Sequence, residues 1–397
     1  MIHKQYNSLF KGLGEIDFVY DIKLKDNCLP VVEPPRKIPF KMELKIKQEL
    51  DRLEKLGVIK NVTEPTEWVN SMVITKKPNN SIRICIDPQS LNKAIIRERF
   101  KMSTFEELAA KMPRARYFSV LDASKGFYMI KLSTKSQLLT TFNAGHFGRY
   151  CYNRLPFGLN SAPEVFSRCF SEIFKNCKGV EIYVDEIIIW GETLSEHNDR
   201  LKIVLDTAKE ANVKFNIEKF KFGIQEVKYV GHILSNEGIK PDPEKIKAIV
   251  QMDEPKTKKD LQTILGIVTY VSKFVPNVSD LTYSLRQLLR KNIEFIWSDK
   301  QKQDFINLKN ILTSQPVLKF FEIDKPVTLS VDSSSTGLGA VLLQDNMPCA
   351  YASKALTDTQ RSWAQIEKEM LAIVFACEKF NQFIYGKEVL VETDHKP

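Results

Sequence analysis

The chain has 397 residues, of which 43% are hydrophobic and 27% charged, and this composition excludes a low-complexity disordered chain. Lys and Arg number 58 against 49 Asp and Glu, so the formal net charge is +9, which is compatible with a polyanionic partner and equally with an ordinary basic surface. No apolar run approaches the roughly 20 residues that span a bilayer, and the first residues lack the apolar core of a secretory signal, which predicts an intracellular protein that does not enter a membrane.

The cysteine and histidine content limits the metal and redox chemistry of the chain. Seven cysteines form no CxxC pair, and five histidines give no Cys/His spacing typical of a zinc site. An odd number of widely spaced cysteines indicates reduced thiols rather than a disulfide framework. At roughly 150 residues per domain, the length predicts two to four domains.

The first hundred residues predict a connector, a helix and a hairpin. After an irregular start, four prolines between residues 30 and 39 indicate an extended connector. Residues 42–56 place apolar side chains at near-helical spacing, and Gly57 stands where a helix cap is expected. Residues 72–75 and 82–86 are short β-rich runs, which predicts a hairpin with a basic, exposed turn between them.

Two apolar stretches tipped with carboxylates are the strongest chemical signal. Asp122 ends the first, and residues 181–190 are β-branched and aromatic on both sides of Asp185 and Glu186, which predicts a buried hairpin with this acidic pair as its turn. Carboxylates at such a tip cost on the order of several kcal/mol unless a cation is bound. Two Mg²⁺ ions suit three such acids and the chemistry of in-line phosphoryl transfer. Taken alone, a short acidic turn is more often simply solvated.

The second half of the chain predicts a helical region and then a further unit. Strands and helices alternate as far as Gly231, residues 239–243 break this pattern, and residues 244–315 are expected to be mostly helical. A strand that begins at Val327 opens a third unit, which the end of the sequence at Pro397 is expected to cut short.

A second set of three acids falls in this last unit. Asp332 and Asp394 each end a strand, and Glu369 lies on a predicted helix, so one acid on each element predicts a second metal cage. Glu367 is the neighbouring alternative to Glu369. The apolar face of the predicted helix is expected to consist of Ile366, Met370, Ile373, Val374 and Cys377.

Several motifs together resemble a known family. Tyr183–Glu186 is similar to the Tyr-x-Asp-Asp box of reverse transcriptases, and Leu155–Pro163 matches the Leu-Pro-Phe-Gly-Leu-x-x-Ala-Pro signature of the gypsy class of LTR retrotransposons. Further boxes match in family order, namely Arg83–Asp87, Leu91–Lys93, Phe118–Phe127 and Val227–His232. One box would be weak evidence, but an ordered series is specific.

The resemblance implies an α+β fold, a right-hand polymerase with fingers, palm and a thumb-like connection, followed by a truncated ribonuclease H-like α/β domain. The implied boundaries are an N-terminal extension or linker at 1–40, fingers and palm at 41–238, a mainly helical thumb or connection at 239–325, and the incomplete ribonuclease H-like domain at 326–397.

The resemblance also implies an activity and its partners. The chain would be an RNA-directed DNA polymerase that adds deoxynucleotides to a DNA primer on an RNA or DNA template, using two Mg²⁺ ions, with Mn²⁺ as the alternative. It would act in the cytoplasm within a retroelement particle, with access to the nucleus. The oligomeric state stays open.

Residue roles follow from the matching boxes. Asp122, Asp185 and Glu186 would be catalytic metal ligands, and Asp332, Glu369 and Asp394 would hold metal in the second domain, with Glu367 outside the family register. The remaining roles are Lys77 and Arg83 for the triphosphate, Phe127 against a 2′-hydroxyl, Phe157 and Gly158 for the nucleotide and template base, and Tyr229, Gly231 and His232 for the primer end. Lys219 is either a proton donor to pyrophosphate or an ordinary exposed lysine.

The sequence also departs from the family pattern. Glu186 replaces the second aspartate of the box, and Asp87-Pro88-Gln89 stands where the family usually has Asp-Tyr-Arg. Because the sequence stops three residues after Asp394, negligible ribonuclease activity is expected from this chain alone. The alternatives are therefore a catalytically degenerate nucleic-acid-binding remnant of the same element, or an unexpressed relic.

Overall fold

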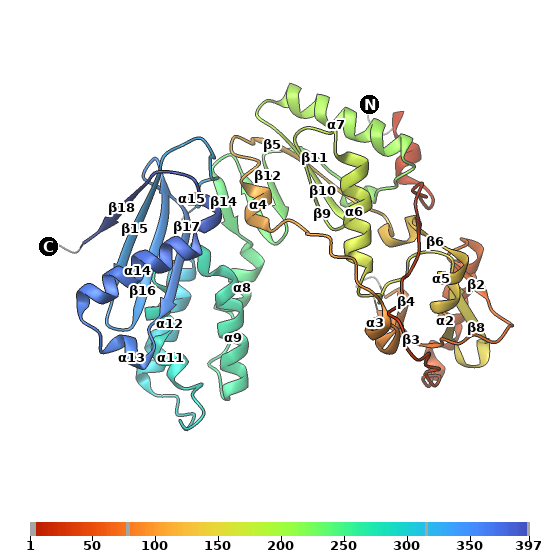
Figure 1. Cartoon of the computed structure of the whole chain (residues 1–397), viewed down its shortest axis with the longest axis horizontal. Helices are drawn as coiled ribbons and strands as arrows, with labels where there is room; N and C mark the ends of the chain where they lie inside the picture. Colours follow the sequence, from red (N-terminus) through yellow and green to blue (C-terminus); the bar gives the residue numbers. More distant parts are fainter. Residues whose placement is uncertain (1–4, 77–79, 314–316, 395–397) are drawn as a thin grey trace. The chain divides into compact units, whose positions relative to one another are not determined.

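The computed structural model describes residues 5–76, 80–313 and 317–394 (Figure 1). The chain forms two compact units. The first unit comprises Met1–Thr104 and Phe118–Ile224, and the second comprises Phe105–Tyr117 and Gln225–Pro397. The segment 105–117 thus belongs with the C-terminal half, although it lies within the predicted fingers and palm. The four predicted domains and the boundaries between them stay a prediction.

The first unit contains a five-stranded sheet and a four-stranded sheet. The five-stranded sheet has the order β2-β8-β7-β3-β4, and the four-stranded sheet has the order β11-β5-β10-β9. The strands are β1 (Val19–Tyr20), β2 (Ile59–Asn61), β3 (Asn70–Lys76), β4 (Ile82–Asp87), β5 (Tyr117–Asp122), β6 (Lys131–Leu132), β7 (Phe142–Asn143), β8 (Arg149–Tyr152), β9 (Val180–Tyr183), β10 (Glu186–Gly191) and β11 (Lys221–Ile224).

The first unit also contains helices, some of which pack on these sheets. They are η1 (Asn7–Phe10), η2 (Phe40–Met42), α2 (Glu43–Lys55), α3 (Gln89–Ala94), η3 (Gly126–Met129), α5 (Thr134–Leu139), η4 (Gly145–Phe147), α6 (Ala162–Phe174), α7 (Leu194–Glu210) and η5 (Ile217–Lys219). Contacts join α6 to β9, α7 to β10, and the two helices to each other, so they pack on the four-stranded sheet (Figure 1). This packing buries Phe166 and Phe170 completely.

The N-terminal predictions are confirmed for the helix and the hairpin. Helix α2 buries Ile46, Leu50 and Leu53, and Gly57 after it has φ +67°, a left-handed conformation that glycine adopts without strain. Strands β3 and β4 pair antiparallel, and part of their connecting turn lies outside the described residues. The start of the irregular opening segment is packed against the core, because Leu9 is fully buried.

The acidic hairpin differs from its prediction by one residue. Glu186 pairs with Tyr183, so the turn is Val184-Asp185 and Glu186 is already the first residue of β10. Val184 has φ +54°. Only β10 is deeply buried, at residues 187–189, whereas β9 is half-exposed. The composition of the stretch predicted two strands but not the register between them, because apolar residues flank the acids on both sides.

The second unit begins with helix α4 (Phe105–Ala109) and a three-stranded sheet of order β12-β13-β14. Its strands are β12 (Glu226–Tyr229), β13 (His232–Ser235) and β14 (Gly238–Pro241). Residues 239–243, expected to break the strand pattern, therefore begin within a strand. The predicted helical region follows as α8 (Pro243–Val250), α9 (Lys258–Val271), η6 (Ser272–Phe274), α10 (Val278–Leu281), α11 (Tyr283–Gln287) and α12 (Asp299–Thr313).

A four-stranded mixed sheet of order β17-β16-β15-β18 completes the second unit. Strands β15 (Val327–Ser333) and β18 (Val389–Thr393) are parallel, and β16 (Gly337–Gln344) and β17 (Met347–Ala355) form an antiparallel hairpin beside them. Helix α14 (Gln365–Lys379) packs on β15 and β16 (Figure 1). The short helices α13 (Asp358–Arg361) and α15 (Asn381–Ile384) flank α14 in the chain.

The predicted apolar face of α14 is largely wrong. Ile366, Met370 and Val374 are about half-exposed, at 52%, 58% and 51%, whereas Ala372 and Ala376 are fully buried. Apolar residues recur at helical spacing on two sides of this helix, so spacing alone does not select the buried side. The small alanine side chains allow the helix to lie close to the sheet.

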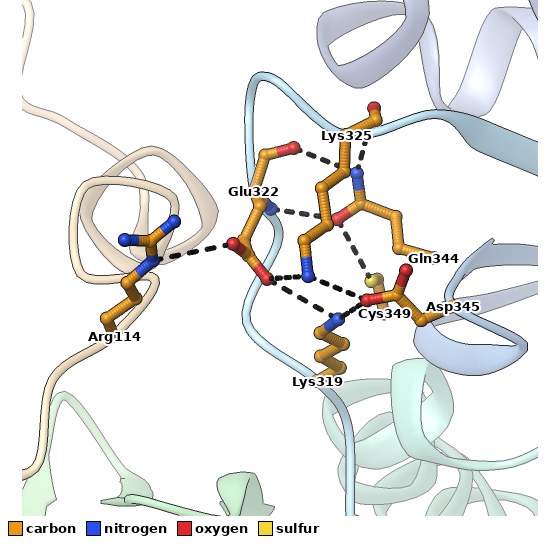
Figure 2. A network of polar contacts seen from close by, with 7 residues as sticks. All are labelled: Arg114, Lys319, Glu322, Lys325, Gln344, Asp345 and Cys349. Atoms are coloured by element: carbon orange, nitrogen blue, oxygen red, sulfur yellow. Dashed lines mark hydrogen bonds and ion pairs between the residues drawn. The ribbon is translucent and has the colours of Figure 1, made fainter.

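A polar network anchors the connection between α12 and this sheet (Figure 2). Glu322 lies between Lys319 and Lys325, and both lysines also pair with Asp345 in the β16–β17 turn. The amide of Gln344 donates to the carbonyl of Glu322 at 2.8 Å. The segment 319–325 is therefore bonded to the end of β16 by side chains of both.

Two absences apply to the residues described above. No disulfide joins any of the seven cysteines, all of which lie in the described part of the chain. Across the described ranges, we find no helix with both the length and the apolar character that crossing a bilayer requires.

Candidate functional site

The first unit brings Asp122 and Asp185 together at the ends of neighbouring strands. Asp122 is the last residue of β5, and Asp185 lies in the β9–β10 turn, next to β5 in the sheet. The amide of Ala123 donates a hydrogen bond to the carbonyl of Asp185 at 2.8 Å, which fixes the two strand ends to each other. The sequence could not place them this closely, because 63 residues separate them in the chain.

The carboxylates of this cluster repel one another. Desolvation by the surrounding protein is the largest cause of the raised pKa of Asp185, and the Asp122 carboxylate raises it further. The Asp185 residue nevertheless keeps an exposed surface. The pKa of Glu186 is raised by desolvation, then by Asp185 and Asp122. Groups whose ionised forms are disfavoured in this way are suited to binding a cation.

Lys219 is part of this cluster. Its ammonium group lies 2.6 Å from a carboxylate oxygen of Asp122, and this hydrogen bond is the main cause of the raised pKa of Lys219. Asp185 and Glu186 raise the same pKa further. Lys219 is exposed, which agrees with its prediction as an ordinary exposed lysine. It also forms an ion pair with Asp122, the predicted catalytic aspartate.

Two aromatic rings of the predicted nucleotide site pack against each other in the same unit. The rings of Phe127 and Phe157 are 4.9 Å apart, and the Arg83 guanidinium lies 4.4 Å from the centroid of the Phe157 ring. Arg83 also lowers the pKa of Asp185, so it is close enough to act on the acidic cluster. At Gly158, φ is +115° and a β-carbon would lie 2.2 Å from the Ile86 carbonyl oxygen, so only glycine fits.

These contacts place most of the predicted nucleotide-site residues in one unit. Arg83, Phe127, Phe157 and Gly158 belong to the first unit with the acids. Lys77 lies outside the described residues. The predicted primer-end residues Tyr229, Gly231 and His232 lie in the second unit, and their association with the carboxylates stays a prediction.

Sequence reasoning missed a buried histidine that supports the β5 strand. His197 on α7 is fully buried, and its Nε2 lies 2.9 Å from the Ser119 hydroxyl. The Gly223 amide on β11 donates to the same hydroxyl at 3.0 Å. The only sequence signal was the position of His197 on the buried side of an amphipathic helix. Ser119 is three residues before Asp122, so this contact helps to fix the strand that carries the aspartate.

The predicted primer-end residues form a tight turn between β12 and β13. Val230 and Gly231 have φ of +46° and +73°, and the buried His232 ring stacks on Phe105 with centroids 3.8 Å apart. Burial lowers the pKa of His232 to about 4.

The pH dependence of stability is expected to report this buried histidine. In the unfolded chain His232 takes up a proton near its usual pKa of about 6.5, whereas the folded chain keeps it neutral, so acid favours unfolding. The free energy of unfolding of the second unit should fall by about 2 kcal/mol from this group between about pH 7 and pH 5. His232→Phe keeps the stacked ring and removes the titration. Chemical denaturation should therefore show a shallower pH dependence for this variant, and an equal slope would contradict the prediction.

The three acids of the second predicted metal cage lie together in the second unit. Asp332 on β15, Glu369 on α14 and Asp394 after β18 each offer a carboxylate oxygen, and these oxygens lie within 4.8 Å of one another. In the part of the chain that the structure describes, it is the one set of three that is so close. The carboxylate oxygens of Asp122, Asp185 and Glu186 do not all lie within 4.8 Å of one another.

The buried member of this cage is held by hydrogen bonds. Glu369 is 4% exposed and accepts bonds from the hydroxyl of Ser333 at 2.6 Å and from the amide of Gln365 at 2.9 Å. The pKa of Asp332 is raised by desolvation and then by Asp394 and Glu369. A buried, oriented carboxylate beside two further acids fits a hard divalent cation.

The alternative acid Glu367 has a different role. It is exposed, and its carboxylate accepts a hydrogen bond from the Ala364 amide at 2.8 Å, which caps the start of α14. The structure therefore favours Glu369 over Glu367 as the inward-facing member.

Comparisons with known proteins agree with both halves of the chain. Residues 74–234 match the family described as reverse transcriptase (RNA-dependent DNA polymerase), and residues 297–391 match the RNase H-like domain found in reverse transcriptase. The chain is 33% identical over 410 residues to the retrovirus-related Pol polyprotein from transposon 297 of Drosophila melanogaster. This alignment covers 100% of this chain and 38% of the relative. It is 32% identical over 372 residues to the Pol polyprotein from transposon gypsy of the same organism, covering 89% of this chain and 36% of the relative.

Solved structures show the same fold. The foamy viral protease-reverse transcriptase dRH in complex with double-stranded DNA matches with a TM-score of 0.91 and 23% identity, and the match covers 100% of this chain and 71% of that chain. The same viral protein in complex with an RNA/DNA hybrid matches with a TM-score of 0.85 and 23% identity, covering 100% of this chain and 54% of that chain.

Fold and comparisons together define a reverse transcriptase fold followed by a ribonuclease H-like domain. More particularly, the chain belongs to the Pol family of LTR retrotransposons, in which it is a reverse transcriptase/ribonuclease H region of the gypsy class. The predicted family and fold class are thereby confirmed. The chain spans less than two fifths of the length of these two curated relatives.

Proposed function

We propose that this chain is an RNA-directed DNA polymerase that extends a DNA primer on an RNA or DNA template. The observation that carries the proposal is the hydrogen-bonded pairing of the strand ends that bear Asp122 and Asp185, with Lys219 and Arg83 beside them. Two carboxylates on a rigid sheet edge, flanked by cations, suit a reaction in which negative charge builds up on a triphosphate.

Asp122 and Asp185 would hold the metal ions. Two bound divalent cations, Mg²⁺ or Mn²⁺, would neutralise charge on the attacking 3′-hydroxyl and on the departing pyrophosphate. Glu186 is one methylene longer than aspartate. It is the first residue of β10, whereas Asp185 lies in the turn before it, so the two carboxylates extend from different parts of the hairpin. It would be an auxiliary ligand.

The chain's own residues would bind and position the nucleotide. Arg83, whose guanidinium lies over the Phe157 ring, would make a bidentate contact with phosphate, and Lys77 would add a second charge. Phe127 packs against Phe157 and would exclude a 2′-hydroxyl. Lys219, protonated beside Asp122, would be placed to donate a proton to the leaving pyrophosphate.

Primer extension tests the proposal directly. The chain is incubated with a DNA primer annealed to an RNA template, deoxynucleotides, and Mg²⁺ or Mn²⁺, with a chelator control. Metal-dependent extension supports the polymerase. Binding of the duplex without extension under either metal would overturn it and favour the second candidate, a catalytically degenerate nucleic-acid-binding remnant. The replacement of aspartate by Glu186 is the observation that favours this candidate.

Both candidates predict salt-dependent binding to nucleic acid. The chain carries a formal net charge of +9, and contacts with phosphates release counterions. Affinity for an RNA/DNA duplex should fall by about tenfold or more when the salt concentration rises from about 50 to about 200 mM. Fluorescence anisotropy with a labelled duplex measures this fall. An affinity unchanged by salt would contradict a basic binding surface for either candidate.

We further propose that Asp332, Glu369 and Asp394 hold divalent metal in the ribonuclease H-like domain. The proximity of their oxygens and the buried, hydrogen-bonded Glu369 support this metal centre. Mn²⁺ binding that is lost in Asp332→Asn would support it.

A further inference from the structure

Helix α10, in the helical region before the ribonuclease H-like domain, packs directly against β16 beside the proposed metal centre. A β-carbon on Gly339 would lie 2.2 Å from an Asn277 side-chain oxygen, and one on Gly337 would lie 2.5 Å from the Ser279 hydroxyl. The absence of a side chain at both glycines therefore leaves room for the Asn277 and Ser279 side chains against β16. In the sheet, Gly339 pairs with Asp332, so α10 begins one strand away from the first metal ligand.

Asp280 on this helix holds the turn that follows Asp332. One oxygen of its carboxylate, Oδ1, accepts hydrogen bonds from the Ser334 hydroxyl at 2.9 Å and from the Thr336 hydroxyl at 2.7 Å. Within the turn, the amide of Gly337 donates to the Ser334 hydroxyl oxygen at 2.8 Å. The turn from Ser334 to Gly337 is thus closed internally and anchored from outside by one carboxylate.

The anchored turn leads directly to two groups of the metal centre. Ser333, the residue before the turn, donates its hydroxyl to Glu369 at 2.6 Å, and Asp332 precedes Ser333. Asp332 is exposed, so packing alone does not fix its carboxylate. The backbone on its C-terminal side is fixed by Glu369 and by Asp280.

We propose that Asp280 is a positioning residue for the ribonuclease H-like metal centre, which fixes the end of β15 through the Ser334 and Thr336 hydroxyls and so orients Asp332 for a divalent cation. The inference rests on the metal centre proposed above and not on the polymerase activity. Asp280 also adds, as a smaller contribution after Asp394 and Glu369, to the raised pKa of Asp332. Residues that orient metal ligands in this way commonly change metal affinity by on the order of 10- to 100-fold when they are removed.

Mn²⁺ binding to the full chain, measured by the loss of the free-ion electron paramagnetic resonance signal, tests this role. All variants carry Asp185→Asn, which removes a ligand of the other proposed metal site, and the component lost in Asp332→Asn defines the centre. Asp280→Ala removes the acceptor of both hydroxyls and should weaken Mn²⁺ binding by on the order of 10- to 100-fold. Asp280→Asn keeps a carbonyl oxygen at the accepting position and should bind within about threefold of the parent, because only a screened charge is lost.

The control is Asp324→Ala, which removes an exposed aspartate from the same unit and should leave binding unchanged. Thermal unfolding of each variant checks that the domain is folded. Equal binding by Asp280→Ala and the parent, with the Asp332 component present, would overturn the positioning role and leave the metal centre in place. Binding that Asp332→Asn does not affect would overturn the centre itself and the inference with it. Equal weakening in Asp280→Asn and Asp280→Ala would show an effect of charge, and would also overturn positioning by hydrogen bonds.

Discussion

Replacing Asp122 with asparagine is expected to lower primer extension by on the order of 10³-fold, because a neutral amide binds the catalytic cations weakly and charge stabilisation of several kcal/mol is lost. The substitution keeps the shape of the side chain, and Lys219 remains beside it. Steady-state primer extension with Mg²⁺ measures the effect, which should fall on kcat rather than on duplex affinity.

Asp199→Asn is the matched control for this substitution. Asp199 is an exposed aspartate on α7 of the same unit, so the same chemical change should leave extension unchanged. Full activity in Asp122→Asn would show that Asp122 is not a catalytic metal ligand. It would therefore exclude the two-metal mechanism at this sheet edge.

Replacing Glu186 with aspartate is expected to raise primer extension, by up to about 10²-fold. Shortening the side chain by one methylene withdraws the carboxylate by about one bond length, and misplacement of a catalytic group by about 1 Å costs a factor of this order. Mg²⁺ tolerates poor octahedral geometry badly, so the gain should be larger with Mg²⁺ than with Mn²⁺. Extension rates for both chains under both metals measure it.

The control for this gain is the Glu186→Gln variant. If Glu186 is an auxiliary ligand, the glutamine variant should lie at or below the parent. An aspartate variant no faster than the parent would mean that position 186 does not limit the reaction. An inert parent alongside an active Glu186→Asp variant would establish the degenerate remnant as the natural state.

Local motifs in the sequence predicted the parts of the site that depend on residue type. A few consecutive residues are enough to pick out residue types that the proposed chemistry needs. These are the carboxylates at strand ends, the glycine at 158, and the acids at 332, 369 and 394. The hairpin of β3 and β4 and the helix ending before Gly57 were equally local, since turn and cap residues mark them.

Register and facing were less predictable. The β9–β10 turn lies one residue earlier than predicted, which leaves Asp185 in the turn and puts Glu186 on the strand. Helix α14 turns Ala372 and Ala376 to the sheet and leaves Met370 exposed. In both elements apolar residues occur on both sides, so the choice depends on the partner surface, which the local sequence does not contain.

The sequence by itself determined which chemistry is proposed for this chain, because side chains suited to metal and phosphate binding are recognisable by type and by their place at the ends of strands. Only the tertiary structure decided which of these groups lie together. Asp122 meets Asp185 because β5 and β10 are neighbours in one sheet, and Asp280 reaches the turn after Asp332 because α10 packs against β16. Such pairings join residues about 50 or more positions apart, and packing of whole elements, rather than any local preference, brings them together.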